Sequence, residues 1–188
     1  MADTQAPEIQ QAQYKDTIPL WLAVAITVLI SVPFTLWLGQ YNLAVWCSFI
    51  VWAEYFALGA KPAALKIIVP CFAYSAILTA LTLAAIPLLG FLPSLVVPGD
   101  LAVGVALFVG VAFMVYSMGW WKGFQEGSLP FFNGISMVLA VYFTSSYPPI
   151  VQGAAAPIFA GVWTILLALF GAALGLFNVW ILFPRKVN

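Results

Sequence analysis

Apolar runs of about twenty residues recur along the whole chain, and they constrain its fold more than any motif. Of its 188 residues, 64% are hydrophobic and only 6% are charged, whereas soluble domains carry about 25% charged residues. A water-soluble core cannot hide that much apolar surface. Each run is long enough to cross the roughly 30 Å core of a bilayer as a helix. The sequence therefore predicts an all-α, polytopic membrane protein.

Proline, glycine and charged residues divide the apolar sequence into six segments, which we expect to be six transmembrane helices. The six segments are residues 17–39, 43–59, 63–89, 101–121, 129–147 and 154–183. Residues 1–16 have neither the basic cluster nor the cleavage site of a signal peptide, so we expect the first segment to remain in the membrane.

The basic residues provide an independent test of this division. Six crossings bring all of them to one side and leave the opposite loops, including residues 90–100, without any lysine or arginine. Basic residues in short loops concentrate in the cytoplasm. We therefore expect both tails, residues 1–16 and 184–188, to be cytoplasmic and residues 90–100 to form a non-cytoplasmic loop. The basic residues are Lys15, Lys61, Lys66, Lys122, Arg185 and Lys186.

The chain also resembles itself when it is shifted by 87 residues. Between positions 51 and 73, eight residues are identical to those 87 positions later, including Tyr55 and Tyr142, where a composition this biased gives about two by chance. The identities predict a 3+3 inverted repeat, with residues 17–89 as one half and 101–183 as the other. The alternative is coincidence, since small and aromatic residues recur in any membrane protein.

An inverted repeat of three helices places a solute site near the membrane midplane, where the halves meet. The second and fifth segments are the shortest, and Gly or Pro ends both of them. A matching pair of short segments is the best pointer in a sequence to such a site. Small residues at Ala102, Ala106 and Gly110, and at Gly171 and Gly175, predict faces for close helix packing.

Glu54 is the main candidate for a functional residue, because it lies inside the second apolar segment. A charged side chain there is disfavoured unless it faces protein, water or a cation. In one interpretation its carboxylate reaches the membrane interface and meets Lys61 or Lys66. In the other it faces a cavity between the halves, where it could couple proton movement or select among solutes.

The other candidates for a solute path lie on the same two short segments. Tyr55 and Tyr142 could close the two ends of a narrow passage, or they could anchor the helices at the lipid interface. The polar residues of these segments could line a wet path or simply bond neighbouring helices, which is their more frequent role. These polar residues are Ser48, Asn133, Ser136, Thr144, Ser145 and Ser146.

Several classes of function are disfavoured by what the sequence lacks. It has no histidine, no Gly-rich phosphate loop, no cluster with metal-ligand spacing and no nucleophile beside a base. We therefore expect no enzyme activity, no cofactor and no bound metal. Six scattered cations do not make the basic surface that nucleic-acid binding needs. Cys47 and Cys71 are expected at different depths, so we predict no disulfide.

Short motifs give the chain a resemblance to a known family. The motifs are WCSF at 46–49, YFA at 55–57, and YF at 142–143 followed by PP at 148–149. In these and in the number of helices, the chain resembles the small bacterial inner-membrane proteins of domain-of-unknown-function family 1097. The family has no established activity, so the resemblance implies the bacterial cytoplasmic membrane and little else.

Together these features predict a membrane channel or carrier for a small neutral or weakly ionised solute. A path with few polar groups disfavours inorganic ions and bulky charged substrates. We expect the protein to form a homo-oligomer in the lipid bilayer. The alternative is a non-transporting membrane subunit that anchors or assembles a partner complex, which short loops and a polar N-terminal tail would also suit.

Overall fold

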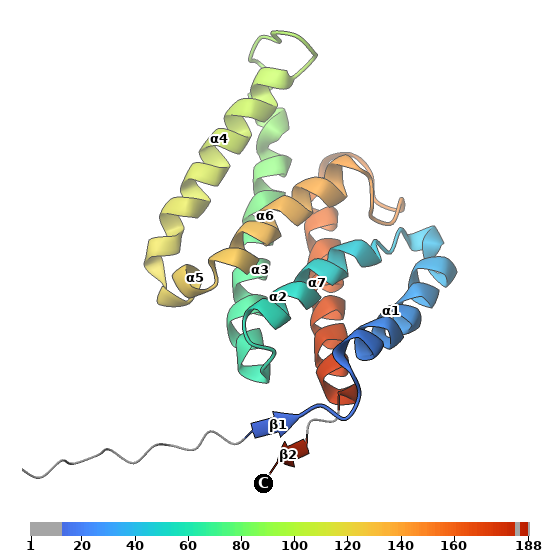
Figure 1. Cartoon of the computed structure of the whole chain (residues 1–188). Helices are drawn as coiled ribbons and strands as arrows, with labels where there is room; N and C mark the ends of the chain where they lie inside the picture. The colour runs from blue at the N-terminus through green and yellow to red at the C-terminus, as the bar shows by residue number, and fades with distance from the viewer. Residues whose placement is uncertain (1–12, 183–184, 188) are drawn as a thin grey trace, which may run out of the picture.

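The computed structural model describes residues 13–182 and 185–187, so most of the predicted N-terminal tail lies outside it. The described chain is helical apart from two short strands that pair antiparallel, β1 (Gln13–Lys15) and β2 (Arg185–Val187) (Figure 1). The α-helices are α1 (Leu20–Trp37), α2 (Val45–Ala57), α3 (Leu65–Ala85), α4 (Asp100–Ser117), α5 (Lys122–Glu126), α6 (Ser128–Phe143) and α7 (Ala156–Ile181).

Each of the six predicted segments corresponds to one α-helix, so the prediction of an all-helical chain is confirmed. The short helix α5 was not predicted, because its five residues fall in an expected loop. Four helical stretches are long and apolar enough to cross a membrane, which is consistent with a membrane protein. They are the helices α1, α3, α4 and α7 with their flanking 3-10 turns.

Helices α2 and α6 are too short to meet that criterion. They contain 13 and 16 residues, which correspond to about 20 and 24 Å of helix against a bilayer core of about 30 Å. Six crossings therefore remain a prediction at this point.

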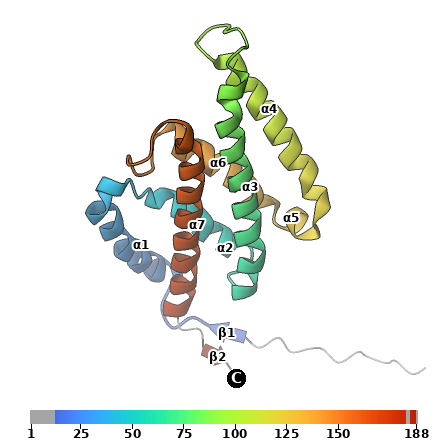
Figure 2. The same cartoon turned by 180° about the vertical axis from the view of Figure 1, so that it is seen from behind.

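The antiparallel helices α3 and α7 form the centre of the molecule. Helices α2 and α6 cross one face of this pair, where α2 packs mainly on α7 and α6 mainly on α3. Figure 2 shows the opposite face, with α3 and α7 in front. Helix α1 lies against α7, and α4 lies against α3. The largest apolar core, which includes Val51, Tyr55, Phe72, Val138 and Ala168, lies between α2, α3, α6 and α7.

Glycine residues allow the helices to approach one another closely. A Cβ atom at Gly171 of α7 would overlap the carbonyl oxygen of Ser48 on α2. One at Gly134 of α6 would overlap the Ser75 hydroxyl of α3, and one at Gly110 of α4 would overlap a side chain of α3. The predicted packing faces at Gly110 and Gly171 are thus confirmed, because only a residue without a side chain fits these contacts.

The basic residues and the uncharged loops lie on opposite sides of the molecule. In Figure 1 the paired strands, the link between α2 and α3, and α5 lie along the lower-left edge. These elements and the first turn of α3 contain all six lysine and arginine residues. The links from α1 to α2, from α3 to α4 and from α6 to α7 lie along the upper-right edge and contain none.

Candidate functional site

The central polar contact of the molecule joins the two short helices. The Asn133 side chain of α6 donates a hydrogen bond from Nδ2 to Oε1 of Glu54 on α2, at 2.6 Å. Glu54 is only 2% exposed, and Asn133 is partly buried. The structure thus brings together two of the predicted site residues, one from each predicted half, although 79 positions separate them in the sequence.

This placement argues against the first interpretation of Glu54, at the membrane interface. The second is met only in part, because Glu54 faces the second predicted half but lines none of the pockets described below. Its carboxyl group does not reach Lys61 or Lys66: among the side chains that the structure describes, the one ion pair is the exposed contact of Lys122 with Glu126, at 3.4 Å. Glu54 is instead held inside the protein by an uncharged partner. A carboxyl group with a single neutral donor is poorly compensated for its loss of water.

Polar atoms without partners are concentrated on α2. Glu54 Oε2, Ser48 Oγ, Trp52 Nε1 and Tyr55 OH are all buried and have no hydrogen-bond partner among the described residues. A buried polar group left unpaired costs about 1–3 kcal/mol. Such groups are rare in folded proteins, and several on one short helix suggest a site for a polar ligand or for water.

The unpaired groups of α2 belong to two adjoining faces of the helix. Ser48, Trp52 and Tyr55 are spaced i, i+4, i+7 and therefore share one face. This face meets α7, where the ring atom Cδ1 of Tyr55 lies 2.8 Å from the position that a Cβ would take at Gly175. Glu54 lies on the neighbouring edge, toward α6. Both faces contact helices of the second predicted half.

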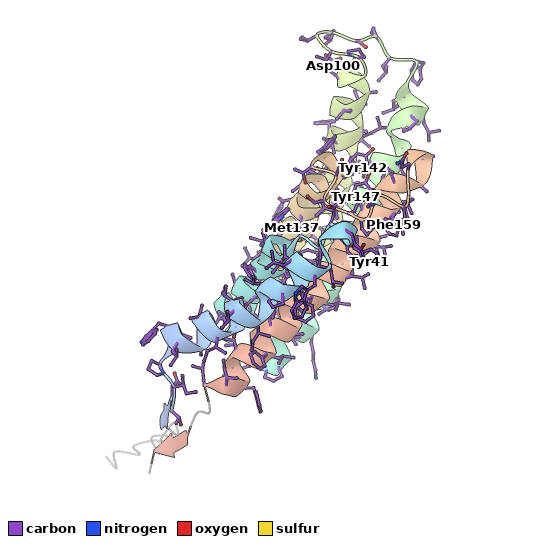
Figure 3. All side chains as sticks on the ribbon, turned by 90° about the vertical axis from the view of Figure 1, so that its right-hand side faces the viewer. Tyr41, Asp100, Met137, Tyr142, Tyr147 and Phe159 are labelled. Atoms are coloured by element: carbon purple, nitrogen blue, oxygen red, sulfur yellow. The ribbon has the colours of Figure 1, made fainter. Side chains whose placement is uncertain are left out.

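Tyr55 and Tyr142 do not have equivalent surroundings, although the sequence repeat aligns them. Tyr55 is fully buried against α7. Tyr142 is partly buried and stacks on Tyr147, with ring centroids 6.4 Å apart and planes 4° from parallel. Figure 3 shows these two rings near Phe159 of α7, and Tyr147 meets Phe159 edge to face.

Two of the predicted path residues lie away from Glu54. Ser136 is exposed on α6. Thr144 is exposed just after the end of α6, where its hydroxyl donates to the carbonyl oxygen of Ala140 at 2.6 Å and contacts Ser146 Oγ at 2.8 Å. These bonds stay within one helix end, so they do not connect Thr144 with the Glu54–Asn133 pair.

Asn42 is a prominent polar contact that the sequence did not indicate. Its side-chain Nδ2 donates to the carbonyl oxygens of Ser145, at 3.1 Å, and Tyr147, at 3.0 Å. Its own carbonyl oxygen accepts a hydrogen bond from Trp163 Nε1 at 3.3 Å. An asparagine in an expected loop is unremarkable, and the partners lie more than 100 positions away, so no local pattern predicts these bonds.

Two surface pockets share Asn42. One has a volume of about 290 Å³ and extends to Val45 and Ser146. The other has a volume of about 310 Å³ and extends to Tyr147 and Gln152. Neither pocket is lined by a charged residue, so their polar groups are amides, hydroxyls and backbone atoms.

Apolar side chains fill the interior below these pockets. Ala44 and Cys47 of α2 and Val141 of α6 are buried in one cluster, and Met137 of α6 packs against it. A separate gap between α2, α3 and α7, lined by apolar side chains that include Val51, has a volume of only about 10 Å³. That gap has room for about one water molecule.

The two cysteines are free, as predicted, and both are buried. Cys47 lies in the cluster between α2 and α6. Cys71 lies on α3 and donates from Sγ to the carbonyl oxygen of Gly123 at 3.3 Å. The described part of the chain contains no group of three or more His, Cys, Asp or Glu side chains that could hold a metal ion.

Comparison with known protein families finds no matching family model, and comparisons with curated proteins and with solved structures give no significant match. The resemblance to domain-of-unknown-function family 1097 therefore remains a prediction from short motifs.

Proposed function

We propose that this chain is a multi-pass protein of the bacterial cytoplasmic membrane that carries a small neutral or weakly ionised solute. The observation that supports this most is the buried Glu54 carboxyl group, paired with Asn133 where the two short helices meet. An ionisable residue inside a membrane protein is costly, and such residues usually mark the path of a substrate or an ion.

The packing of the helices supports an inverted repeat. We pair α2 with α6 and α3 with α7, following the sequence repeat, and α1 with α4, because each is the first helix of its predicted half. Exchanging these partners turns the contact of α2 with α7 into that of α6 with α3. It likewise turns the contact of α1 with α7 into that of α4 with α3. The structure contains all four contacts. The central contact between α3 and α7 converts into itself. A pseudo-two-fold axis through the α3–α7 pair would have this effect.

The ends of the two short helices also correspond. The backbone N–H of Ala60 donates to Tyr55, and that of Ser146 donates to Val141, at 2.8 and 2.9 Å. In each case the preceding residue has a positive φ angle, which is the geometry of a Schellman cap. These caps correspond at a shift of 86 residues, one less than the shift of the sequence repeat, so the two helix ends match in geometry but differ by one residue in register.

The distribution of charge supports six crossings with cytoplasmic termini. All basic residues belong to elements along one edge of the molecule, and the opposite loops lack them. Helices α2 and α6 must connect these two edges, since each begins on one and ends on the other.

The volume of the interior favours a carrier or a gated channel over an open pore. The packed cluster around Cys47 and the gap of about 10 Å³ beside Val51 leave no room for a solute in this conformation. Passage would therefore require movement of α2 or α6. A site with one carboxyl group, one amide and two hydroxyl groups suits a small solute with both hydrogen-bond donors and acceptors, such as an amide, an alcohol or a protonated organic acid.

The experiment is a flux measurement in liposomes with small amides, alcohols and organic acids. We expect protein-containing vesicles to take up at least one class faster than empty vesicles, and Glu54→Gln to reduce that uptake about tenfold or more. The matched control is Glu126→Gln, which changes an exposed glutamate paired with Lys122 and should leave uptake unchanged. Equal fluxes in protein-containing and empty vesicles across the whole panel would contradict the proposal.

The mass of the detergent-extracted protein tests the expected assembly. A homo-oligomer agrees with the proposal. Stable co-purification of a foreign subunit, together with the absence of flux, would favour the alternative of a non-transporting membrane subunit.

A further inference from the structure

Asn42 holds the link between α1 and α2 to the loop between α6 and α7. Its backbone is left-handed, with φ 50°, after the 3-10 turn Gly39–Tyr41, a conformation that asparagine tolerates better than most residues. The amide Nδ2 donates to the carbonyl oxygens of Ser145 and Tyr147. One side chain of the first half thus bonds twice to the backbone of the second half.

Asn42 also lines both of the pockets described above, so the two pockets adjoin at this residue. Together the pockets would provide about 600 Å³ at this end of the molecule, the sum of the two volumes, which is enough for a small solute. Without the Asn42 amide they would merge into one opening that reaches Leu43 and Ala44, at the start of α2.

A single line of contacts leads from this opening to the Glu54–Asn133 pair. On α2, Ala44 and Cys47 follow Asn42, and Glu54 lies two helical turns beyond Cys47 on the same edge. Facing them on α6, Val141 and Met137 lie in or against the same cluster as Cys47, and Asn133 is one turn beyond Met137. We call this line of contacts the α2–α6 seam. Figure 3 shows Met137 of the seam and Tyr142 and Tyr147 near its outer end.

We infer that the Asn42 amide is a latch that keeps the outer end of the α2–α6 seam closed. When its two hydrogen bonds break, the loop after α6 separates from the start of α2, and a solute in the merged pocket gains access first to Cys47 and then to Glu54. Both acceptors are backbone carbonyls, so Asn42 is the one side chain that takes part in these two bonds. The inference deepens the proposed function, but the closure of the seam can be tested without any solute.

The native cysteines provide the test. Cys47 lies in the cluster beneath the latch, whereas Cys71 is equally buried on α3, is bonded to Gly123 and packs with Phe131 and Ile135 near the inner end of the seam. N-ethylmaleimide would be added to the full-length protein in liposomes, and mass spectrometry would report the modification rate of each cysteine in the same sample. Cys71 thereby serves as the internal reference for general loosening of the fold.

Two variants release the latch in different ways. Asn42→Gly keeps the left-handed backbone accessible and removes the amide. Asn42→Asp keeps the size of the side chain but replaces the donor with an acceptor that faces two carbonyl oxygens. Two hydrogen bonds of ordinary strength correspond to about a tenfold to hundredfold shift in an opening equilibrium.

We expect the Cys47 modification rate to rise about tenfold or more in both variants, with the Cys71 modification rate unchanged. The control is Gln40→Ala, an exposed amide of the same link, which should change neither rate.

An unchanged Cys47 rate in both variants would overturn the latch, and so would an equal rise at Cys71, because that would indicate general loosening. The flux assay separates this inference from the proposed function. If Cys47 became selectively exposed but no solute crossed the membrane, the result would support the latch and contradict transport. Flux with a Cys47 rate that stays at the wild-type value in both variants would support transport and reject the latch.

Discussion

The hydrogen bond between Asn133 and Glu54 is open to a direct energetic test. At 2.6 Å it is at the short end of the range for protein hydrogen bonds, and Glu54 is 2% exposed, so solvent screens it little. Hydrogen bonds to charged groups contribute about 1.5–3 kcal/mol. Since Glu54 Oε2 has no partner among the described residues, Asn133→Ala would leave the whole carboxyl group without a protein donor. We expect this variant to lose about 2 kcal/mol of stability.

A double-mutant cycle isolates the pair. The free energy of unfolding would be measured for the wild type, Asn133→Ala, Glu54→Ala and the double variant, by titrating the micelle-solubilised protein with SDS. We expect a coupling energy of about 1.5 kcal/mol, equivalent to roughly a tenfold change in the unfolding equilibrium. Ser136→Ala, on the exposed side of α6, is the control and should not couple to Glu54. A coupling below about 0.5 kcal/mol for Asn133 would refute the reasoning that this pair joins the two helices.

Two other contacts have consequences that thermal unfolding in detergent can measure. Gly171→Ala places a methyl group against the Ser48 carbonyl. Overpacking of this kind costs about 1–3 kcal/mol of stability, whereas alanine gains about 1 kcal/mol over glycine in helix propensity. We expect the cost to be the larger of the two and the Tm to fall. Gly104→Ala meets nothing within 4 Å and should maintain or raise the Tm; the opposite order of the two variants would be inconsistent with the packing described. The buried Asn178 side chain donates a hydrogen bond from Nδ2 to Thr27 Oγ1 at 2.9 Å. Thr27→Val removes this acceptor and should lower the free energy of unfolding by about 1 kcal/mol. An unchanged Tm would mean that this bond contributes nothing to stability.

Several features of the fold could be predicted from local sequence. Apolar runs bounded by proline, glycine and charge identified the six long helices, because the length and hydropathy of a segment are properties of that segment alone. Small residues spaced by four identified the close-packed faces at Gly110 and Gly171 for the same reason. Helix α5 was missed because its five residues, KGFQE, are too few to carry a periodic signal.

The candidate site could be predicted only in part. Glu54 was identified because an acid inside an apolar segment stands out in any sequence. Asn133 was one of several polar residues on its helix, and nothing local distinguishes it from Ser136, which the structure leaves exposed. Tyr55 and Tyr142 align in the repeat, yet one is fully buried and the other stacks at the end of its helix, because burial depends on the neighbouring helix.

By itself, the sequence determined that the chain is helical, that its surface is apolar along most of its length, and that an acidic residue, Glu54, lies inside an apolar helix. Which groups meet was decided only by the tertiary structure. Asn133 reaches Glu54, and Asn42 reaches the loop after α6, because α2 and α6 cross the same face of the α3–α7 pair. That crossing depends on glycine contacts between distant segments. The energy of such a contact depends on how well two helix surfaces fit together, so the sequence of either segment alone does not predict it.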